Sequence, residues 1–247
     1  MPQQTTQQQP TQNPPAQATP ETPEAEKARK QQEHEKAEQE LNQEEHQRIM
    51  GVVPNFNTVN GTAAPLSPGQ KFRLAFRSTV DPFQFVAAAL DAGLSEAQDD
   101  YKGYGWGPAG YGKRFGAAYG DAFNGTIIGN AVLPVLFHQD ARYYRMGTGK
   151  FSKRFWYALS TTVRCKGDNG KWQWNYSNVL GNFIAGGISN FYYDQQDRGV
   201  GLAVERGLTN NAEGALGSLF VEFWPDISAR LHKHKNAPTA PAAPANP

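Results

Sequence analysis

The chain of 247 residues has few of the residues that mark redox, metal or nucleophilic chemistry. Its single cysteine, Cys165, excludes an intramolecular disulfide, and because no CxxC neighbour is present we expect a structural thiol. No HExxH, CxxC or DxD spacing occurs, so we expect no metal site and no cofactor. No GxSxG surrounds a serine, and the glycine-rich loop before Lys113 lacks the serine or threonine of a phosphate-binding loop.

Long apolar runs are also missing. The two least charged windows are residues 116–137, which contain Asp121 and two asparagines, and residues 177–193, which contain three asparagines. Neither window offers the roughly 20 predominantly apolar residues that a transmembrane helix needs. A small helical membrane channel or anchor therefore stays an alternative, behind peripheral association with a membrane surface.

Large apolar side chains are scarce at both ends of the chain. Residues 1–47 are mostly Gln, Pro, Thr, Glu and Lys, with Leu41 the main exception, and cannot bury enough apolar surface to form a core. We expect residues 1–48 to be a disordered and charged-helix tail, residues 49–235 a single helical domain, and residues 236–247 a disordered Pro/Ala tail. The start lacks the apolar region of a signal peptide, but its Gln/Pro-rich composition is typical of exported bacterial proteins after cleavage.

Neither sign of charge dominates, since the formal net charge is +1. Residues 1–48 hold nine acidic and five basic side chains, which leaves 14 acidic and 19 basic side chains in the rest of the chain. These basic residues are dispersed along the sequence and form no tract. We therefore do not expect nucleic acid as a partner.

What the sequence has in abundance is small residues at helical spacing, above all between Gly112 and Phe137. Three rows with a spacing of four residues can be drawn there. The first row is Gly112, Gly116 and Gly120; the second is Tyr111, Phe115, Tyr119 and Phe123; the third is Ala117, Asp121, Gly125 and Gly129. On a helix these rows form a flat groove of the glycine-zipper kind, an aromatic ridge and a second shallow groove. We expect a central helix over residues 108–133 that ends or kinks near Pro134.

Capping signals place the other helices. Ser67 before Pro68, with Gln70 following, is typical of a capping box, and Asp81 before Pro82 repeats the signal. Further helices are predicted at about residues 24–48, 151–162, 177–193 and 198–224, with Asn210 and Asn211 as an interruption and Pro225 as the end of the last one.

The small row Gly181, Ala185 and Ser189 is predicted to dock on the first groove of the central helix. Asn169-Gly170 predicts a β-hairpin between residues 163–166 and 171–174, whereas residues 55–65 and 141–150 are expected to be loop and turn. The predicted fold is therefore mainly α: a single domain of about six helices around the glycine-rich central helix, with one small β-hairpin.

Several strings, in this order, resemble a group of uncharacterised exported bacterial proteins. They are RIMGVVPNFNTVN, LSPGQKFRLAF, DPFQFVAAALDAG, GYGKRFGAAYGDAF, LFHQDARYYRMGTG, NYSNVLGNFIAGGISNFYY and VEFWPDI. The likeness covers about residues 47–230. It implies a location in the periplasm or outer envelope, with a signal peptide already removed, and it implies no activity.

Candidate chemistry is sparse. His138 and Asp140 follow the central helix and could act as base and acid, with Arg142 and Arg145 as anion ligands; the alternative is helix capping and ion pairing. Glu205, on the last helix, is a weaker catalytic candidate. The aromatic side chains of Tyr104 and Trp106 either pack on the domain or line a ligand opening. These are set out as hypotheses because no motif supports them.

A buried charge is expected at Asp121, which lies among small residues and is costly to bury unless it is paired. An ion pair with Arg206 or Arg198 is favoured over a role in proton or metal chemistry. We expect a non-catalytic structural or interaction protein of the cell envelope, possible partners being itself, envelope components or a membrane surface. The alternatives are a hydrolase or a lipid- or glycan-binding protein with a site near His138, and the channel or anchor named above.

Overall fold

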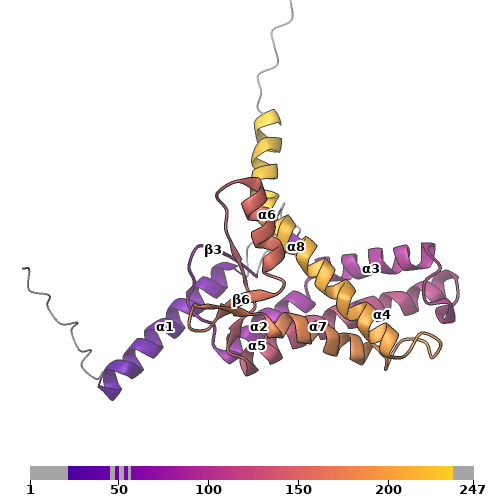
Figure 1. Cartoon of the computed structure of the whole chain (residues 1–247), viewed down its shortest axis with the longest axis horizontal. Coiled ribbons are helices and arrows are strands. Elements are labelled where there is room, and N and C mark those ends of the chain that lie inside the picture. Colours follow the sequence, from indigo (N-terminus) through magenta and orange to yellow (C-terminus); the bar gives the residue numbers. More distant parts are fainter. Residues whose placement is uncertain (1–21, 45–47, 50–52, 55–56, 236–247) are drawn as a thin grey trace, which may run out of the picture.

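The central helix α4 (Gly107–Ile127) continues as a π-helical turn, η2 (Ile128–Val132), and a short α5 (Leu133–Leu136). The chain therefore passes Pro134 in helical form, and the departure from α geometry lies just before the proline. The computed structural model describes residues 22–44, 48–49, 53–54 and 57–235 (Figure 1). It is mainly helical and has one domain, as predicted.

Six further helices and a 3₁₀ turn surround this axis. They are α1 (Pro23–Glu44), α2 (Pro68–Thr79), α3 (Pro82–Ala97), η1 (Lys102–Tyr104), α6 (Phe151–Ser160), α7 (Tyr176–Ser189) and α8 (Val200–Lys235). The α2 start has the predicted capping box, because the Ser67 hydroxyl accepts from the Gln70 backbone N–H and the Gln70 side chain accepts from the Ser67 N–H. The Asp81 carboxylate caps α3 by accepting from the Phe83 N–H.

The aromatic ridge of α4 packs on α3, which runs beside it in Figure 1. Tyr119 stacks on Phe85 with ring centroids 4.7 Å apart, and the Tyr111 hydroxyl donates to the Ala89 carbonyl at 2.9 Å. Tyr111 also lies beside Gly93, whose missing side chain leaves room for the ring. The aromatic ridge of α4 therefore packs against α3 next to small residues such as Ala89 and Gly93.

The small row of α7 docks on α4 and η2, but on a different row from the one predicted. A Cβ at Gly181 would lie 2.8 Å from the Gly129 Cα, and the Ser189 hydroxyl donates to Asp121 at 2.5 Å. Gly129 and Asp121 belong to the third row, so the expected docking on the first row is wrong. The reason is that the third row carries a carboxylate that the Ser189 hydroxyl can bind.

Helix α8 is continuous over 36 residues, so neither the predicted interruption at Asn210 and Asn211 nor the predicted end at Pro225 occurs. The Asn211 side-chain amide donates to the Gly207 carbonyl of the same helix at 2.7 Å. The side-chain oxygen of Asn211 accepts from the Asn178 amide of α7. In Figure 1, α8 crosses the helical body and its far end continues beside α6.

The charged helix α1 buries one side against the rest of the protein. Ala37 and Leu41 are fully buried against Ala64, Leu66 and Leu74. The helix nevertheless projects from the body at one end (Figure 1). The single leucine of α1 can dock the helix because it packs against Ala64 and Leu66, which precede α2, and against Leu74 of α2.

The β structure is richer than the single predicted hairpin. The predicted hairpin is present as β6 (Arg164–Gly167) and β7 (Trp172–Trp174), and β4 (Gln139–Asp140) adds a third, antiparallel strand. A parallel pair joins β3 (Thr58–Asn60) to β5 (Tyr143–Arg145), where loop and turn were expected. An antiparallel pair joins β1 (Arg48–Ile49) to β2 (Val53–Pro54).

The described residues bury some leucine and tyrosine side chains but many polar ones, and leave many large apolar side chains exposed; we call this distribution inverted polarity. The side chains buried in the described residues include no Phe, Trp, Ile or Met, and several of the most deeply buried are polar, such as Glu222, Gln139 and Ser189. Large apolar residues lie outside instead, with Phe191 82% and Leu90 70% exposed. Interiors normally hold the large aliphatic and aromatic side chains, so this distribution needs a reason.

Candidate functional site

The segment from His138 to Arg145, at the end of the central helix, has two different environments. Asp140 is buried, and its carboxylate accepts from Arg142 Nη2 at 2.8 Å and from the Tyr144 hydroxyl at 2.7 Å. Arg142 also donates to the Ala64 carbonyl. The Asp140 carboxylate therefore takes part in structural bonds between the strands and the Ala64 segment. This agrees with the ion-pairing alternative for Asp140 and not with a catalytic role.

The His138 side chain points elsewhere. It is 86% exposed, and its Nδ1 lies 3.9 Å from Asp168 Oδ2. The backbone at His138 is left-handed, with φ of 52°, and its carbonyl accepts from the Asp168 N–H. Asp168 itself is bound at 2.7 and 2.8 Å by the buried Lys71 ammonium. The structure gives His138 and Asp140 different partners and does not join them as an acid–base pair.

Arg145 belongs to a network around Glu222 of α8. Glu222 is fully buried, and its carboxylate accepts from the Tyr143 hydroxyl and Arg154 Nε, each at 2.7 Å, and from the Met146 and Gly147 backbone N–H groups. Arg145 Nε donates to the Glu222 carbonyl oxygen at 3.2 Å. This network was missed by the sequence analysis. Its members are about 70 residues apart in sequence and leave no local pattern.

These bonds set the pKa values around the Glu222 network. Burial alone would raise the pKa of Glu222, but the hydrogen bonds from Arg154, Tyr143 and the two backbone N–H groups outweigh it and hold the pKa below its usual value. Burial and the neighbouring carboxylate raise the pKa of Tyr143. Glu222 is thus a structural anchor that carries its charge at neutral pH.

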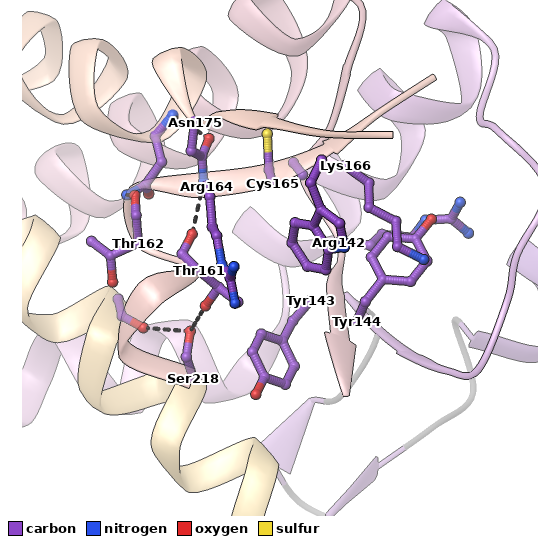
Figure 2. Close-up of a pocket in the computed structure, with 14 residues that line it drawn as sticks. Arg142, Tyr143, Tyr144, Thr161, Thr162, Arg164, Cys165, Lys166, Asn175 and Ser218 are labelled. Carbon is purple, nitrogen blue, oxygen red and sulfur yellow. Dashed lines mark hydrogen bonds between the residues drawn. The ribbon is translucent and has the colours of Figure 1, made fainter. Parts of the chain in front are cut away.

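A small pocket lies between the β6 strand and α8 (Figure 2). Its volume is about 100 Å³, room for about three water molecules. Lys166 lies over the Tyr144 ring, 3.8 Å from the centroid, and the Thr162 hydroxyl is buried without a protein partner. Such an orphan hydroxyl in a small polar space fits a hydration site.

Cys165 lines this pocket, and burial raises the pKa of its thiol to about 12. A thiol with that pKa holds almost no thiolate at neutral pH and is a poor nucleophile. The predicted structural role of Cys165 therefore agrees with its environment.

Asp121 is the single acidic residue of α4 and is bound by several groups. Its carboxylate accepts from the Ser189, Tyr192 and Tyr193 hydroxyls at 2.5, 2.6 and 2.7 Å. Arg206 Nε lies 2.8 Å from Asp121 Oδ2, so these two form the buried ion pair that the sequence favoured. Burial and the adjacent carboxylate raise the pKa of Tyr192 to about 12.

The aromatic loop before α4 borders an open groove of about 600 Å³. Its floor includes Gly112 and Gly116, where an added Cβ would meet no atom within 4 Å. Tyr104 forms one wall, its hydroxyl donating to the Tyr192 carbonyl at 3.2 Å. Gly112 and Gly116 of the first row therefore line an open groove, whereas Gly120 lies against the Tyr192 ring.

Two other candidates lie near this loop but do not line the groove. Trp106 is largely exposed, and its Nε1 donates to Asp99 Oδ1 at 3.1 Å. Glu205 accepts from the Tyr101 hydroxyl at 3.1 Å. Neither contacts His138, so the catalytic and ligand-binding candidates are spread over separate parts of the molecule.

No family model, curated protein or solved structure matches this chain. The resemblance to exported bacterial proteins stays a prediction from the sequence. Among the described residues, no group of three or more His, Cys, Asp or Glu is arranged to hold a metal ion.

Proposed function

We propose that the chain is a non-catalytic interaction protein of the bacterial cell envelope, held against a membrane by the apolar faces of α2 and α3. The observation that supports this most directly is the inverted polarity of the helical body. Buried acids such as Asp121, Asp140 and Glu222 are saturated by internal partners, whereas large apolar residues are exposed. The envelope location rests on the sequence resemblance.

The apolar faces are regular. Exposed apolar residues recur every fourth position along both helices, at Phe72 and Phe76 of α2 and its C-cap Val80, and at Val86, Leu90 and Leu94 of α3. Both helices pack on α4 with other faces, where Ala75, Ala88 and Ala92 are buried. Apolar side chains exposed in rows on a helix are candidates for a protein or membrane interaction site.

The way in which the helices contact one another supports the same proposal. Their interfaces use glycine, alanine and serine, and asparagines such as Asn178 and Asn211 bond across them at 3.0 Å. Helices surrounded by lipid pack through small residues and interhelical hydrogen bonds, because apolar side chains gain nothing by turning inward there. None of the described helices combines the length and the apolar content needed to cross a bilayer.

Flotation with phosphatidylcholine vesicles tests this proposal. The double variant Leu90→Gln/Leu94→Gln removes two side chains that are 70% and 57% exposed. If each contributes about 1–2 kcal/mol on burial in lipid, the pair weakens binding about 30-fold or more. The matched control is Leu208→Gln/Leu216→Gln on α8, with 57% and 65% exposure, which we expect to change binding by less than about threefold. Wild-type protein that fails to float, or equal effects of both pairs, would contradict the proposal.

A further inference from the structure

A polar groove runs along α4 between α3 and α8, and α7 completes its floor. It consists of two adjoining cavities of about 330 and 190 Å³. The residues shared by both cavities are Gln84, Asp121, Ala122, Asn210 and Glu213. We call the combined space the polar groove.

The floor of the polar groove includes most of the third small row of the central helix. Gly125 and Gly129 line it with Asp121, and a Cβ at Gly125 would lie 3.9 Å from both Asn182 Oδ1 and Asn210 Nδ2. The α4 residues on the floor extend from Ala118 to the η2 residue Asn130. At 1.5 Å per residue this is about 18 Å, so the groove is elongated.

Carboxamides without protein partners line the groove. Within the described residues, the side chains of Gln84, Asn130 and Asn210 make no hydrogen bond to the protein. Asn182 is only 8% exposed, yet its Oδ1 accepts no hydrogen bond, and its amide nitrogen makes a single long bond of 3.4 Å to Asn178. A buried carboxamide is normally bonded on both atoms, so this oxygen is available to a ligand.

The groove also carries uncompensated negative charge. Four charged side chains line it: Asp91, Asp121, Arg206 and Glu213. Asp121 and Arg206 neutralise each other, whereas Asp91 and Glu213 have no ion-pair partner among the described residues. Partial burial is the main cause that raises the pKa of Glu213; the nearby Arg206 guanidinium lowers it, and Asp91 and Asp121 raise it by smaller amounts. A bound cation would favour the charged form of Glu213.

A metal ion fits this site poorly because no three acidic or histidine side chains converge in the part of the chain that the structure describes. An anion is disfavoured by the two unpaired carboxylates. An organic cation with several N–H groups fits both features, since ammonium groups donate to carboxylates and to carboxamide oxygens alike.

We propose that the polar groove binds a linear organic polycation of the diamine or polyamine class. One ammonium group lies between Asp91 and Glu213, and the rest of the chain extends along α4 towards Asn182 and Asn130. The carboxamide oxygens accept from its N–H groups. The methylene segments lie over Gly125, where the absence of a side chain leaves room. This activity is independent of membrane association.

Calorimetric titration of the full chain with spermidine tests the proposal. We expect saturable binding that weakens tenfold or more in Glu213→Gln, which removes one carboxylate and keeps its shape. Glu33→Gln is the control, because Glu33 is an exposed acid on the distant α1 and its loss changes the net charge equally. We expect that control to change the affinity by less than twofold.

A second variant keeps the charge and fills the space. Gly125→Leu places a side chain in the groove from a position where a Cβ makes ordinary contacts, and we expect it to abolish spermidine binding without lowering the melting temperature. Absence of spermidine binding in the wild type overturns the proposal. So does equal weakening by Glu213→Gln and Glu33→Gln, which would indicate diffuse charge attraction, or unchanged binding in a folded Gly125→Leu.

Discussion

The Glu222→Gln substitution tests whether the network around Glu222 holds α8 to the rest of the protein. Glu222 is fully buried and joins three elements: α8 itself, the chain at β5 through Tyr143 and Gly147, and α6 through Arg154. Glutamine keeps the size of the side chain but removes the charge. Its amide N–H₂ would also face donors, since all four groups that bond the Glu222 carboxylate are N–H or O–H donors.

The magnitude follows from the burial. Removing one partner of a buried pair costs about 3–5 kcal/mol, because the remaining charge is left without compensation. For a chain of this size that cost corresponds to a fall in melting temperature of about 6–20 °C. The control is Asp226→Asn, which removes the other acid bound to Arg154. Asp226 is 45% exposed, so its loss should cost no more than about 1 kcal/mol.

Urea unfolding at several pH values separates the charge of Glu222 from its shape. The pKa of Glu222 is held below its usual value in the folded state, so its contribution is complete above its unfolded pKa of about 4.3 and is lost as the pH falls through the lower folded pKa. The stability gap between wild type and Glu222→Gln should therefore narrow below about pH 4. A gap below 1 kcal/mol at pH 7, equal costs for Glu222→Gln and Asp226→Asn, or a gap that widens in acid would each refute the reasoning.

Three further predictions follow from packing. Gly181→Ala should lose about 1–3 kcal/mol in urea unfolding, because its Cβ would lie 2.8 Å from the Gly129 Cα, whereas Gly187→Ala, with no atom within 4 Å, should lose nothing. Leu41→Ala should lose about 2–5 kcal/mol of α1 docking, seen as faster proteolysis within α1 than in the wild type. Cys165 should react slowly with a maleimide at pH 8 and rapidly after unfolding, because burial raises its pKa to about 12; rapid labelling of the folded protein would contradict this.

Features set by residues close together in the sequence could be predicted, whereas features that depend on distant residues could not. The caps at Ser67 and Asp81 and the Asn169-Gly170 hairpin are set by residues within four positions of one another, and all three are present. The parallel pairing of β3 with β5 joins residues 58–60 to residues 143–145 through strands of three residues. Such short segments have no detectable period, so nothing local distinguishes them from loop.

The candidate sites show the same limit. The rows on α4 predicted two grooves. Gly112 and Gly116 of the first row line an open cleft, whereas the third row is shared: α7 docks on it at Asp121 and Gly129, and a cleft remains over Gly125. The pairing of Asp121 could be narrowed to two arginines because a buried acid requires a partner. Which residues complete each groove could not be predicted, since they come from α3, α7 and α8 and no periodicity in α4 identifies them.

The glycine rows and the exposed apolar residues have one physical cause. Helices that approach as closely as η2 and α7 do at Gly129 and Gly181 leave no volume between them for leucine or phenylalanine. Polar groups that fit the narrow interface, such as Ser189 and Asp121, must then bond to one another. The large apolar side chains have to lie outside, at a cost of about 25 cal/mol for each Å² left in water. In water alone, a chain with this arrangement would lose much of the free energy that a helical domain gains by burying apolar side chains. We therefore propose that an apolar partner covers the outer faces.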